Sequence, residues 1–274
     1  MKYELTDATQ CGPYGCLRRI VCTESFTCPP GPIEGKSVRV EKGDLGGWVT
    51  GYDNLHQDGT CWLFGDAIAA NGAEVSEGAV LANSARATDD AYIHGLSWIG
   101  GSALVSGNAS VFDHACISGY AEVFGRACVY GHAKVGGNAI VCGNCEVSGR
   151  AIVQDGARIL DQAVVSGWAN IGGQASVGGR ANVGGSAIVY GTAAIEWLSV
   201  IRKNAEIKKP GDCVPVLAWW IGDGDVILTY TRSNGLWTTT CPVKTCNTAE
   251  MTDFLSKRYG TAAGHKFAKL AELM

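Results

Sequence analysis

The side chains of this sequence with the clearest chemical potential recur at intervals of 18 residues. An imidazole can act as a general acid or base, and a guanidinium can bind a carboxylate or a phosphate. An aromatic ring can bind a planar ligand or anchor a partner protein. Two series combine these groups: one consists of His94, Phe112 and Tyr130, and the other of His114, His132, Arg150 and Trp168. What they can do depends on the elements that position them.

Residues 65–207 contain an unbroken six-residue repeat. From Ala67 to Ala205 every sixth residue is small, and in most hexads the residue two positions later is aliphatic, as in Ala73 and Val75. Alternate residues of a strand face the same side, so both point inward. Gly, Asn or Asp precedes nearly every small residue by two positions and supplies a corner, where positive φ costs least in these residue types. The pattern predicts a mainly β chain with a parallel β-helix.

The segment before the repeat, residues 1–64, lacks this period. It contains expected strands at 16–22 and 36–41 and a proline-rich turn between them. We expect an N-terminal cap, because the first turn of a solenoid otherwise exposes its core and unpaired backbone. Its four cysteines lack the C-x2-C spacing of structural zinc sites, so no metal site is expected. They are Cys11, Cys16, Cys22 and Cys28.

The segment after the repeat, residues 208–274, has the pattern of a small α+β cap or partner domain. We expect two helices, one at 249–259 and a second from residue 262 that carries Phe267 and Leu270 on one face. Three tryptophans, Trp219, Trp220 and Trp237, are expected in its core. The expected strands are 214–221, 225–231 and 236–241, joined by hairpin turns at 222–224 and 233–235.

Composition and charge exclude several classes of function. The net charge is −4 and charged residues make up 18% of the chain, so phosphate-driven nucleic-acid binding is not expected. No apolar run approaches the roughly 20 residues that span a membrane, and residues 1–10 do not form a signal peptide. We therefore expect a soluble cytoplasmic protein whose 12 scattered cysteines are reduced thiols. Cys142 and Cys145 resemble a redox or metal pair, but the repeat places Cys145 inward, which argues against a shared site.

A resemblance to a known family begins just before the repeat. The residues that carry it are Gly43–Val49 (Gly-Asp-Leu-Gly-Gly-Trp-Val), Asn54-Leu55, Asp58-Gly59 and Cys61-Trp62, which lead into the hexads. Together they resemble the start of the YdcK-type hexapeptide-repeat proteins of bacteria and phages. The resemblance implies a single-stranded, left-handed parallel β-helix of the acyltransferase type, in which three hexads make one coil. The 24 hexads then give about eight coils.

In a coil of 18 residues, the two series become ladders on different faces. They either bind a ligand or partner, or simply stabilise neighbouring strands. A further outward column is unusually apolar and predicts burial against another subunit. Trimers are usual among the acyltransferases that the resemblance points to, so we expect a homo-oligomer. The candidate interface residues are Val80, Trp98, Ile152 and Ile188, with Phe267 and Leu270 from the C-terminal segment.

Three functions stay open at this point. The first is a non-enzymatic binding or scaffold protein without a cofactor, such as a phage accessory protein that binds or inhibits a host factor in the host cytoplasm. The second is a coenzyme A-dependent acyltransferase with His114 or His132 as general base, which the absence of any loop leaving the repeat disfavours. The third is a sponge for a small nucleotide, with Arg150 on a phosphate and an aromatic ladder on the base.

Overall fold

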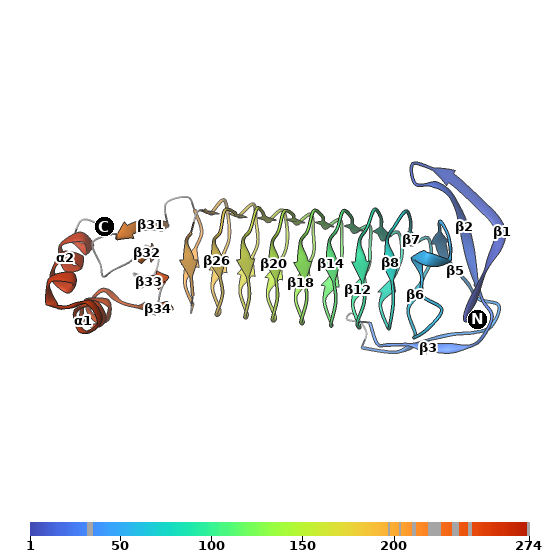
Figure 1. Ribbon diagram of the computed structural model, residues 1–274, viewed down its shortest axis with the longest axis horizontal. Coiled ribbons are helices and arrows are strands. Elements are labelled where there is room, and N and C mark those ends of the chain that lie inside the picture. Colours follow the sequence, from blue (N-terminus) through green and yellow to red (C-terminus); the bar gives the residue numbers. More distant parts are fainter. Residues whose placement is uncertain are drawn as a thin grey trace.

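A computed structural model gives the fold of most of the chain. It describes residues 1–31, 35–196, 198–202, 204–209, 212–218, 226–231, 236–240 and 243–272. A β-solenoid of about nine turns occupies the middle of an elongated molecule, with β1 and β2 at one end and α1 and α2 at the other (Figure 1). The predicted fold class, a mainly β chain with a parallel β-helix, is confirmed. The left-handed sense stays a prediction.

Three parallel sheets form the three faces of the solenoid. Each strand pairs with the strand 18 residues later, as in the pairing of Arg86 with Leu104. The first face contains β5 (Leu45–Val49), β7 (Ile68–Ala69), β10 (Arg86–Ala87), β13 (Leu104–Val105), β16 (Glu122–Val123), β19 (Ile140–Val141), β22 (Arg158–Ile159), β25 (Ser176–Val177) and β28 (Ala194–Ile195).

The second and third faces follow the first in every turn. The second contains β8 (Glu74–Val75), β11 (Tyr92–Ile93), β14 (Ser110–Val111), β17 (Cys128–Val129), β20 (Glu146–Val147), β23 (Val164–Val165), β26 (Asn182–Val183) and β29 (Val200–Ile201). The third contains β6 (Trp62–Leu63), β9 (Val80–Leu81), β12 (Trp98–Ile99), β15 (Cys116–Ile117), β18 (Lys134–Val135), β21 (Ile152–Val153), β24 (Asn170–Ile171), β27 (Ile188–Val189) and β30 (Glu206–Ile207).

The residue types of the hexad explain why the chain turns where it does. The small and aliphatic residues are buried throughout the stack, as Ala133 and Val135 illustrate. Corner residues have positive φ, whether they are glycine, as at Gly119, or Asp113. A Cβ on Gly119 would lie 2.7 Å from the carbonyl oxygen of Gly137, so adjacent turns approach closely there. Corner glycines therefore combine a left-handed conformation with close backbone packing.

One turn of the solenoid precedes the alanine hexads. It consists of β5, Leu55 and β6, with a short 3-10 helix at Tyr52–Asn54; Leu55 bridges to Val75. The glycines of the Leu-Gly-Gly-Trp sequence allow this turn to close. A Cβ on Gly46 would lie 2.7 Å from Cζ2 of Trp62, and one on Gly47 would lie 2.8 Å from Cβ of Leu63. The 24 hexads form the eight predicted coils, and this turn is the ninth.

The N-terminal cap is an antiparallel extension of the first face. Strands β1 (Tyr3–Gly12) and β2 (Gly15–Cys22) pair with each other, and β2 pairs with β5. Strands β3 (Phe26–Cys28) and β4 (Val38–Val40) form a separate pair. The ring of Phe26 packs edge-on against Trp62 at a centroid distance of 5.5 Å. Aromatic residues therefore cover the first turn of the solenoid.

The cysteines of the cap differ from the prediction of reduced thiols. Cys11 and Cys16 form a disulfide, because the β1–β2 register places them directly opposite each other. Cys22 and Cys28 are free and buried. The four cysteines therefore do not converge on one site. Among the described residues there is no group of three or more His, Cys, Asp or Glu side chains that could hold a metal ion.

The C-terminal cap is an antiparallel sheet with two helices. Its strands are β31 (Cys213–Ala218), β32 (Val226–Thr231), β33 (Leu236–Thr240) and β34 (Val243–Cys246). The sequence pattern did not predict β34. The helices are α1 (Thr248–Tyr259) and α2 (Thr261–Ala271). The amide of Val200 donates to Oγ1 of Thr229 at 3.1 Å, which joins this cap to the last turn.

Some predictions for this cap fall outside the described part of the structure. They are the turns at 222–224 and 233–235, residues Trp219 and Trp220, and the side chain of Trp237. Neither of the helices in the described residues is long and apolar enough to cross a membrane.

Candidate functional site

The residues of the first ladder directly follow three strands of the second face, and their rings stack on one another. The rings of His94 and Phe112 lie 5.0 Å apart, and those of Phe112 and Tyr130 are also 5.0 Å apart and parallel. Tyr92, which the sequence reasoning did not include, extends the stack to His94 at 4.3 Å. The 5.0 Å spacing of His94, Phe112 and Tyr130 follows from the distance of about 4.8 Å between strands of neighbouring turns. The first ladder is therefore a continuous stack over three turns.

The second ladder consists of two stacked pairs. The imidazoles of His114 and His132 lie 4.7 Å apart. The guanidinium carbon of Arg150 lies 4.6 Å from the ring centroid of Trp168, a cation–π geometry. All four residues are exposed, and 62% of Trp168 is accessible to solvent. The second ladder therefore presents three basic groups and one large aromatic ring to solvent.

The two ladders lie on either side of one corner of the solenoid. Strands of the second face end at residues 93, 111 and 129, and strands of the third face begin at 98, 116 and 134. Both ladders lie in the connections between them, separated only by the corner residues Asp113 and Gly131. Although the ladders belong to different faces, they therefore form one strip along this corner, which we call the corner strip. It consists of Tyr92, His94, Phe112, Tyr130, His114, His132, Arg150 and Trp168.

Charge is divided across the corner strip. On the side of the first ladder, the hydroxyl of Tyr130 donates to Oε2 of Glu146 at 3.4 Å, and Nδ1 of His94 lies 4.0 Å from Oε2 of Glu77. The second ladder instead carries the basic residues. The strip therefore carries Glu146 beside the first ladder, Asp113 at the corner between the ladders, and Arg150 with the two imidazoles in the second ladder.

The expected subunit interface combines residues of the third face with Phe267 and Leu270 of α2, and two of these residues are buried within the protomer. Val80 is only 4% exposed because the β3–β4 segment covers it, so it is not available to a second subunit. Phe267 is completely buried within its own protomer. Trp98, Ile152 and Leu270 are half-buried, whereas Ile188 is exposed.

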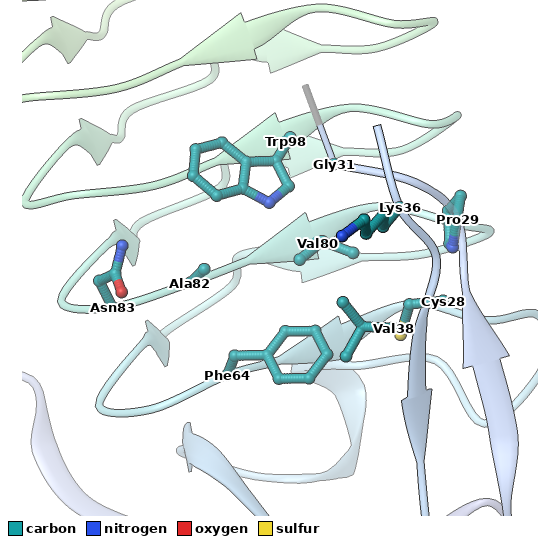
Figure 2. A pocket seen from close by; sticks show the side chains of 10 residues that line it. All are labelled: Cys28, Pro29, Gly31, Lys36, Val38, Phe64, Val80, Ala82, Asn83 and Trp98. Carbon is teal, nitrogen blue, oxygen red and sulfur yellow. The ribbon is translucent and has the colours of Figure 1, made fainter. Parts of the chain in front are cut away.

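A hollow of about 310 Å³ lies where the β3–β4 segment crosses the third face. Its walls are mainly apolar. In Figure 2 the rings of Trp98 and Phe64 lie on opposite sides of Val80 and Ala82, and Val38 and Pro29 approach from the hairpin. The lining residues are Cys28, Pro29, Gly31, Lys36, Val38, Phe64, Val80, Ala82, Asn83 and Trp98. Sequence reasoning missed this hollow, because no period connects residues 28–38 with residues 64–98.

The thiol of Cys28 lines the hollow but is poorly suited to nucleophilic chemistry. Burial is the largest cause that raises its pKa, to about 12, although Lys2 acts in the opposite direction. The thiol donates to the carbonyl oxygen of Thr60 at 3.3 Å. Since the thiolate is the reactive form, Cys28 is a structural thiol.

A buried lysine in the N-terminal cap is a second feature that sequence reasoning missed. Nζ of Lys2 lies 3.1 Å from Sγ of Cys61 and 3.4 Å from the carbonyl oxygen of Asp58. Burial raises the pKa of the Cys61 thiol, while the neighbouring ammonium group of Lys2 lowers it. The two residues are 59 positions apart, and nothing in their local sequence indicates the contact.

The positions of Cys142 and Cys145 are explained by the six-residue repeat, in which both residues lie. Cys145 occupies an inward position, is buried, and donates from Sγ to the carbonyl oxygen of Cys142 at 2.8 Å. Burial raises the pKa of Cys145 to about 12. Cys142 is half-buried and points to the outside of the solenoid. The spacing therefore reflects the hexad frame.

Comparisons with known proteins assign no family to this chain. No protein-family model matches it, and no curated protein matches it at a significant level.

Proposed function

We propose that this chain is a non-catalytic binding or scaffold protein whose partner protein docks on the corner strip. The observation that carries the proposal is that an exposed ladder and a half-buried aromatic ladder flank one corner of a regular solenoid. Aromatic residues and arginine are enriched among the residues that dominate binding energy in interfaces. Stacked rings on paired strands are already ordered before binding, which reduces the entropy lost in association.

The charge of the corner strip defines the kind of partner that fits. Carboxylates of a partner would lie opposite His114, His132 and Arg150, and an apolar or aromatic side chain would cover Trp168. The strip spans five turns, or roughly 20 Å at the spacing of neighbouring strands. This length suits one helix or one extended segment with an acidic edge.

The Arg150–Trp168 pair also supports a second candidate, a sponge for a small nucleotide. A guanidinium group can bind a phosphate, and the ring of Trp168 can stack on a base. An acyltransferase with His114 or His132 as general base has less support. The two imidazoles stack on each other at an exposed corner, and the hexads continue through this region without an inserted loop.

The biological setting belongs to the same proposal. The resemblance of Gly43–Val49 and the following hexads to YdcK-type proteins supports a phage or prophage accessory protein that acts in the host cytoplasm. Self-association through the third face, with Ile152 and Ile188 at the contact, is consistent with the exposed position of Ile188.

The proposal is tested by affinity purification from bacterial lysate, with quantitative mass spectrometry of the proteins retained. Arg150→Glu and Trp168→Ala should lose a partner that the wild-type protein retains. Tyr120→Ala is the matched control, because Tyr120 is an aromatic residue that is 69% exposed at a different corner. Retention of every partner by the two corner-strip variants would contradict the proposal.

A native mass spectrum separates the alternatives. A protein that carries the mass of a nucleotide would favour the sponge, and one that carries coenzyme A and turns over an acyl donor would favour the acyltransferase. A protein free of both, in any oligomeric state, supports the binding protein.

A further inference from the structure

We propose that the hollow between the β3–β4 segment and the third face binds a small organic acid with a flat apolar body and one carboxylate, such as an aromatic carboxylate. This site is separate from the corner strip and does not depend on the proposed function. The inference rests on the apolar walls of the hollow, on hydrogen-bond donors that have no partner among the described residues, and on the small residues that keep the hollow open.

The walls of the hollow suit an apolar ring. Val80 and Ala82 form its floor, and the rings of Trp98 and Phe64 border it on opposite sides (Figure 2). Val38 closes the hairpin side and is itself 47% exposed, although it is a large hydrophobic residue. A volume of about 310 Å³ lies at the lower end of the range for ligand sites, roughly 300–1,000 Å³. The occupant is therefore small.

The polar groups of the hollow are mainly hydrogen-bond donors. Lys36 reaches from the hairpin toward Val80, and Asn83 lies on the opposite side (Figure 2). Within the described residues, no hydrogen bond or ion pair engages the Lys36 ammonium group, the Trp98 indole nitrogen or the Asn83 amide. An ammonium and an indole N–H can only donate. Since one donor is a cation, an anionic acceptor such as a carboxylate complements the hollow best.

Small residues at particular positions create this hollow. Residues 64, 82 and 100 are 18 apart and form one column of the third face, in which Phe64 is followed by Ala82 and Gly100. The Trp98 ring lies over Gly100, where a Cβ would overlap its six-membered ring. A large side chain at residue 82 would fill the space between the two aromatic rings.

The hairpin side is anchored on the solenoid. Pro29 packs on Gly78, where a Cβ would lie 3.2 Å from Cγ of Pro29. Cys28 is buried and bonded to the backbone of Thr60. Gly31 approaches the indole closely, since a Cβ there would lie 3.5 Å from Nε1 of Trp98. These contacts place the wall of the hollow without occupying its interior.

The test uses the full-length protein and two probes of the same shape, phenylacetate and its neutral analogue phenylacetamide. Binding is followed by ¹⁵N–¹H NMR of the tryptophan indole groups, and the Trp98 resonance is identified by its loss in Trp98→Phe. We expect a saturable shift of this resonance with phenylacetate. The affinity for the acid should exceed that for the amide by about tenfold, because only the acid pairs with a cation.

Two variants and one control locate the site. Lys36→Met should remove the preference for the acid, and Ala82→Leu should abolish binding of both probes by filling the floor. Lys42→Met, a change at another exposed lysine of the same cap, should leave both affinities unchanged. The absence of a saturable Trp98 shift, equal affinity for acid and amide, or unchanged binding in Ala82→Leu would each overturn the proposal.

Discussion

The hydroxyl group of Tyr190 donates a hydrogen bond of 2.7 Å to Oδ2 of Asp155, although the two residues are 35 positions apart. The ring of Tyr190 lies over Gly172, in the turn between them, where a Cβ would contact it. The same carboxylate oxygen accepts from the amide of Gly173 at 3.0 Å. One corner carboxylate therefore connects three successive turns of the solenoid.

This arrangement belongs to a recurring corner motif. An acidic corner residue with positive φ accepts a hydrogen bond from the corner glycine amide of the next turn. Asp113 bonds to Gly131 in this way at 3.1 Å, and Asp161 bonds to Gly179 at 2.8 Å. The motif satisfies a backbone donor and places a favourable charge next to it. It provides a reason why aspartate replaces glycine at some corners.

The first prediction concerns the pH dependence of this motif. The amide of Gly173 is the largest cause that lowers the pKa of Asp155, followed by the hydroxyl of Tyr190. A carboxyl whose pKa is lower in the folded state stabilises the protein above its unfolded pKa of about 3.9 and loses this contribution as pH falls through the folded pKa. Asp155→Asn should therefore lower Tm at pH 7, and the difference from wild type should shrink below about pH 4.

Tyr190→Phe provides the matched comparison for Asp155. It removes the second cause of the pKa shift and leaves the Gly173 bond intact, so its decrease in Tm at pH 7 should be smaller than that of Asp155→Asn. Thermal unfolding followed by circular dichroism between pH 3 and pH 7 measures both. If the difference in Tm between wild type and Asp155→Asn grows as pH falls below 4, the ionised carboxylate of Asp155 is not the group that stabilises the fold.

The second prediction concerns the corner glycines. Gly119 has a φ of 70°, and a Cβ there would lie 2.7 Å from the carbonyl oxygen of Gly137. Gly119→Ala should destabilise the protein by about 1–3 kcal/mol, because alanine is strained in this conformation. Gly119→Asp should cost less, because its carboxylate can accept from the amide of Gly137 as Asp113 does from Gly131.

Urea unfolding of Gly119→Ala and Gly119→Asp shows which of the two variants is more stable. Gly136→Ala is the control, since Gly136 lies outside the positive-φ region and its Cβ would meet only the hydroxyl of Ser118, at 3.3 Å. We expect that control to remain within about 0.5 kcal/mol of wild type. If Gly119→Asp is less stable than Gly119→Ala, the corner motif does not account for aspartate at these positions.

The solenoid was predictable because its period is explicit in the residue types. Inward alanine and valine, and a corner every six residues, determine both the strands and their 18-residue register. The turn formed by residues 45–63 was missed, because Leu55 and Trp62 fill its core without the alanine period. Strand β1 was missed because most of its residues are exposed, which gives it no apolar face.

The candidate site residues could be predicted only where they lie within the six-residue repeat. The spacing placed His114 next to His132 and Arg150 next to Trp168. It could not show that both ladders flank one corner, because this depends on where each short strand ends. The hollow depends on the β3–β4 segment, which folds back from the cap onto Val80. Such a contact between distant segments leaves no pattern in the sequence of either one.

The third prediction tests the packing of the solenoid interior. Val135 is 1% exposed, and Lys134 beside it on β18 is exposed. Val135→Asp should destabilise the protein by several kcal/mol, because it buries a carboxyl group without a partner. Lys134→Ser should change the free energy of unfolding by less than about 0.5 kcal/mol. Guanidinium unfolding of both variants measures this contrast, and equal effects would show that the inward and outward positions are assigned wrongly.

The last prediction concerns the reactivity of the free cysteines. Burial raises the pKa of Cys28 and of Cys145 to about 12, so at pH 8 almost none of either thiol is ionised in the folded protein. Cys128 and Cys142 are only half-buried, and burial raises the pKa of their thiols as well. Because the thiolate is the species that reacts, iodoacetamide at pH 8 should label Cys128 and Cys142 slowly and leave Cys28 and Cys145 unlabelled.

Peptide mass spectrometry after timed labelling gives the rate for each cysteine. Labelling in guanidinium is the control, since unfolding returns every thiol to an ordinary pKa and should make all four react at similar rates. Rapid labelling of Cys145 in the folded protein would mean that the inward hexad position opens to solvent. That result would also contradict the tight packing on which the Val135 prediction depends, so the two measurements check the same interior by independent chemistry.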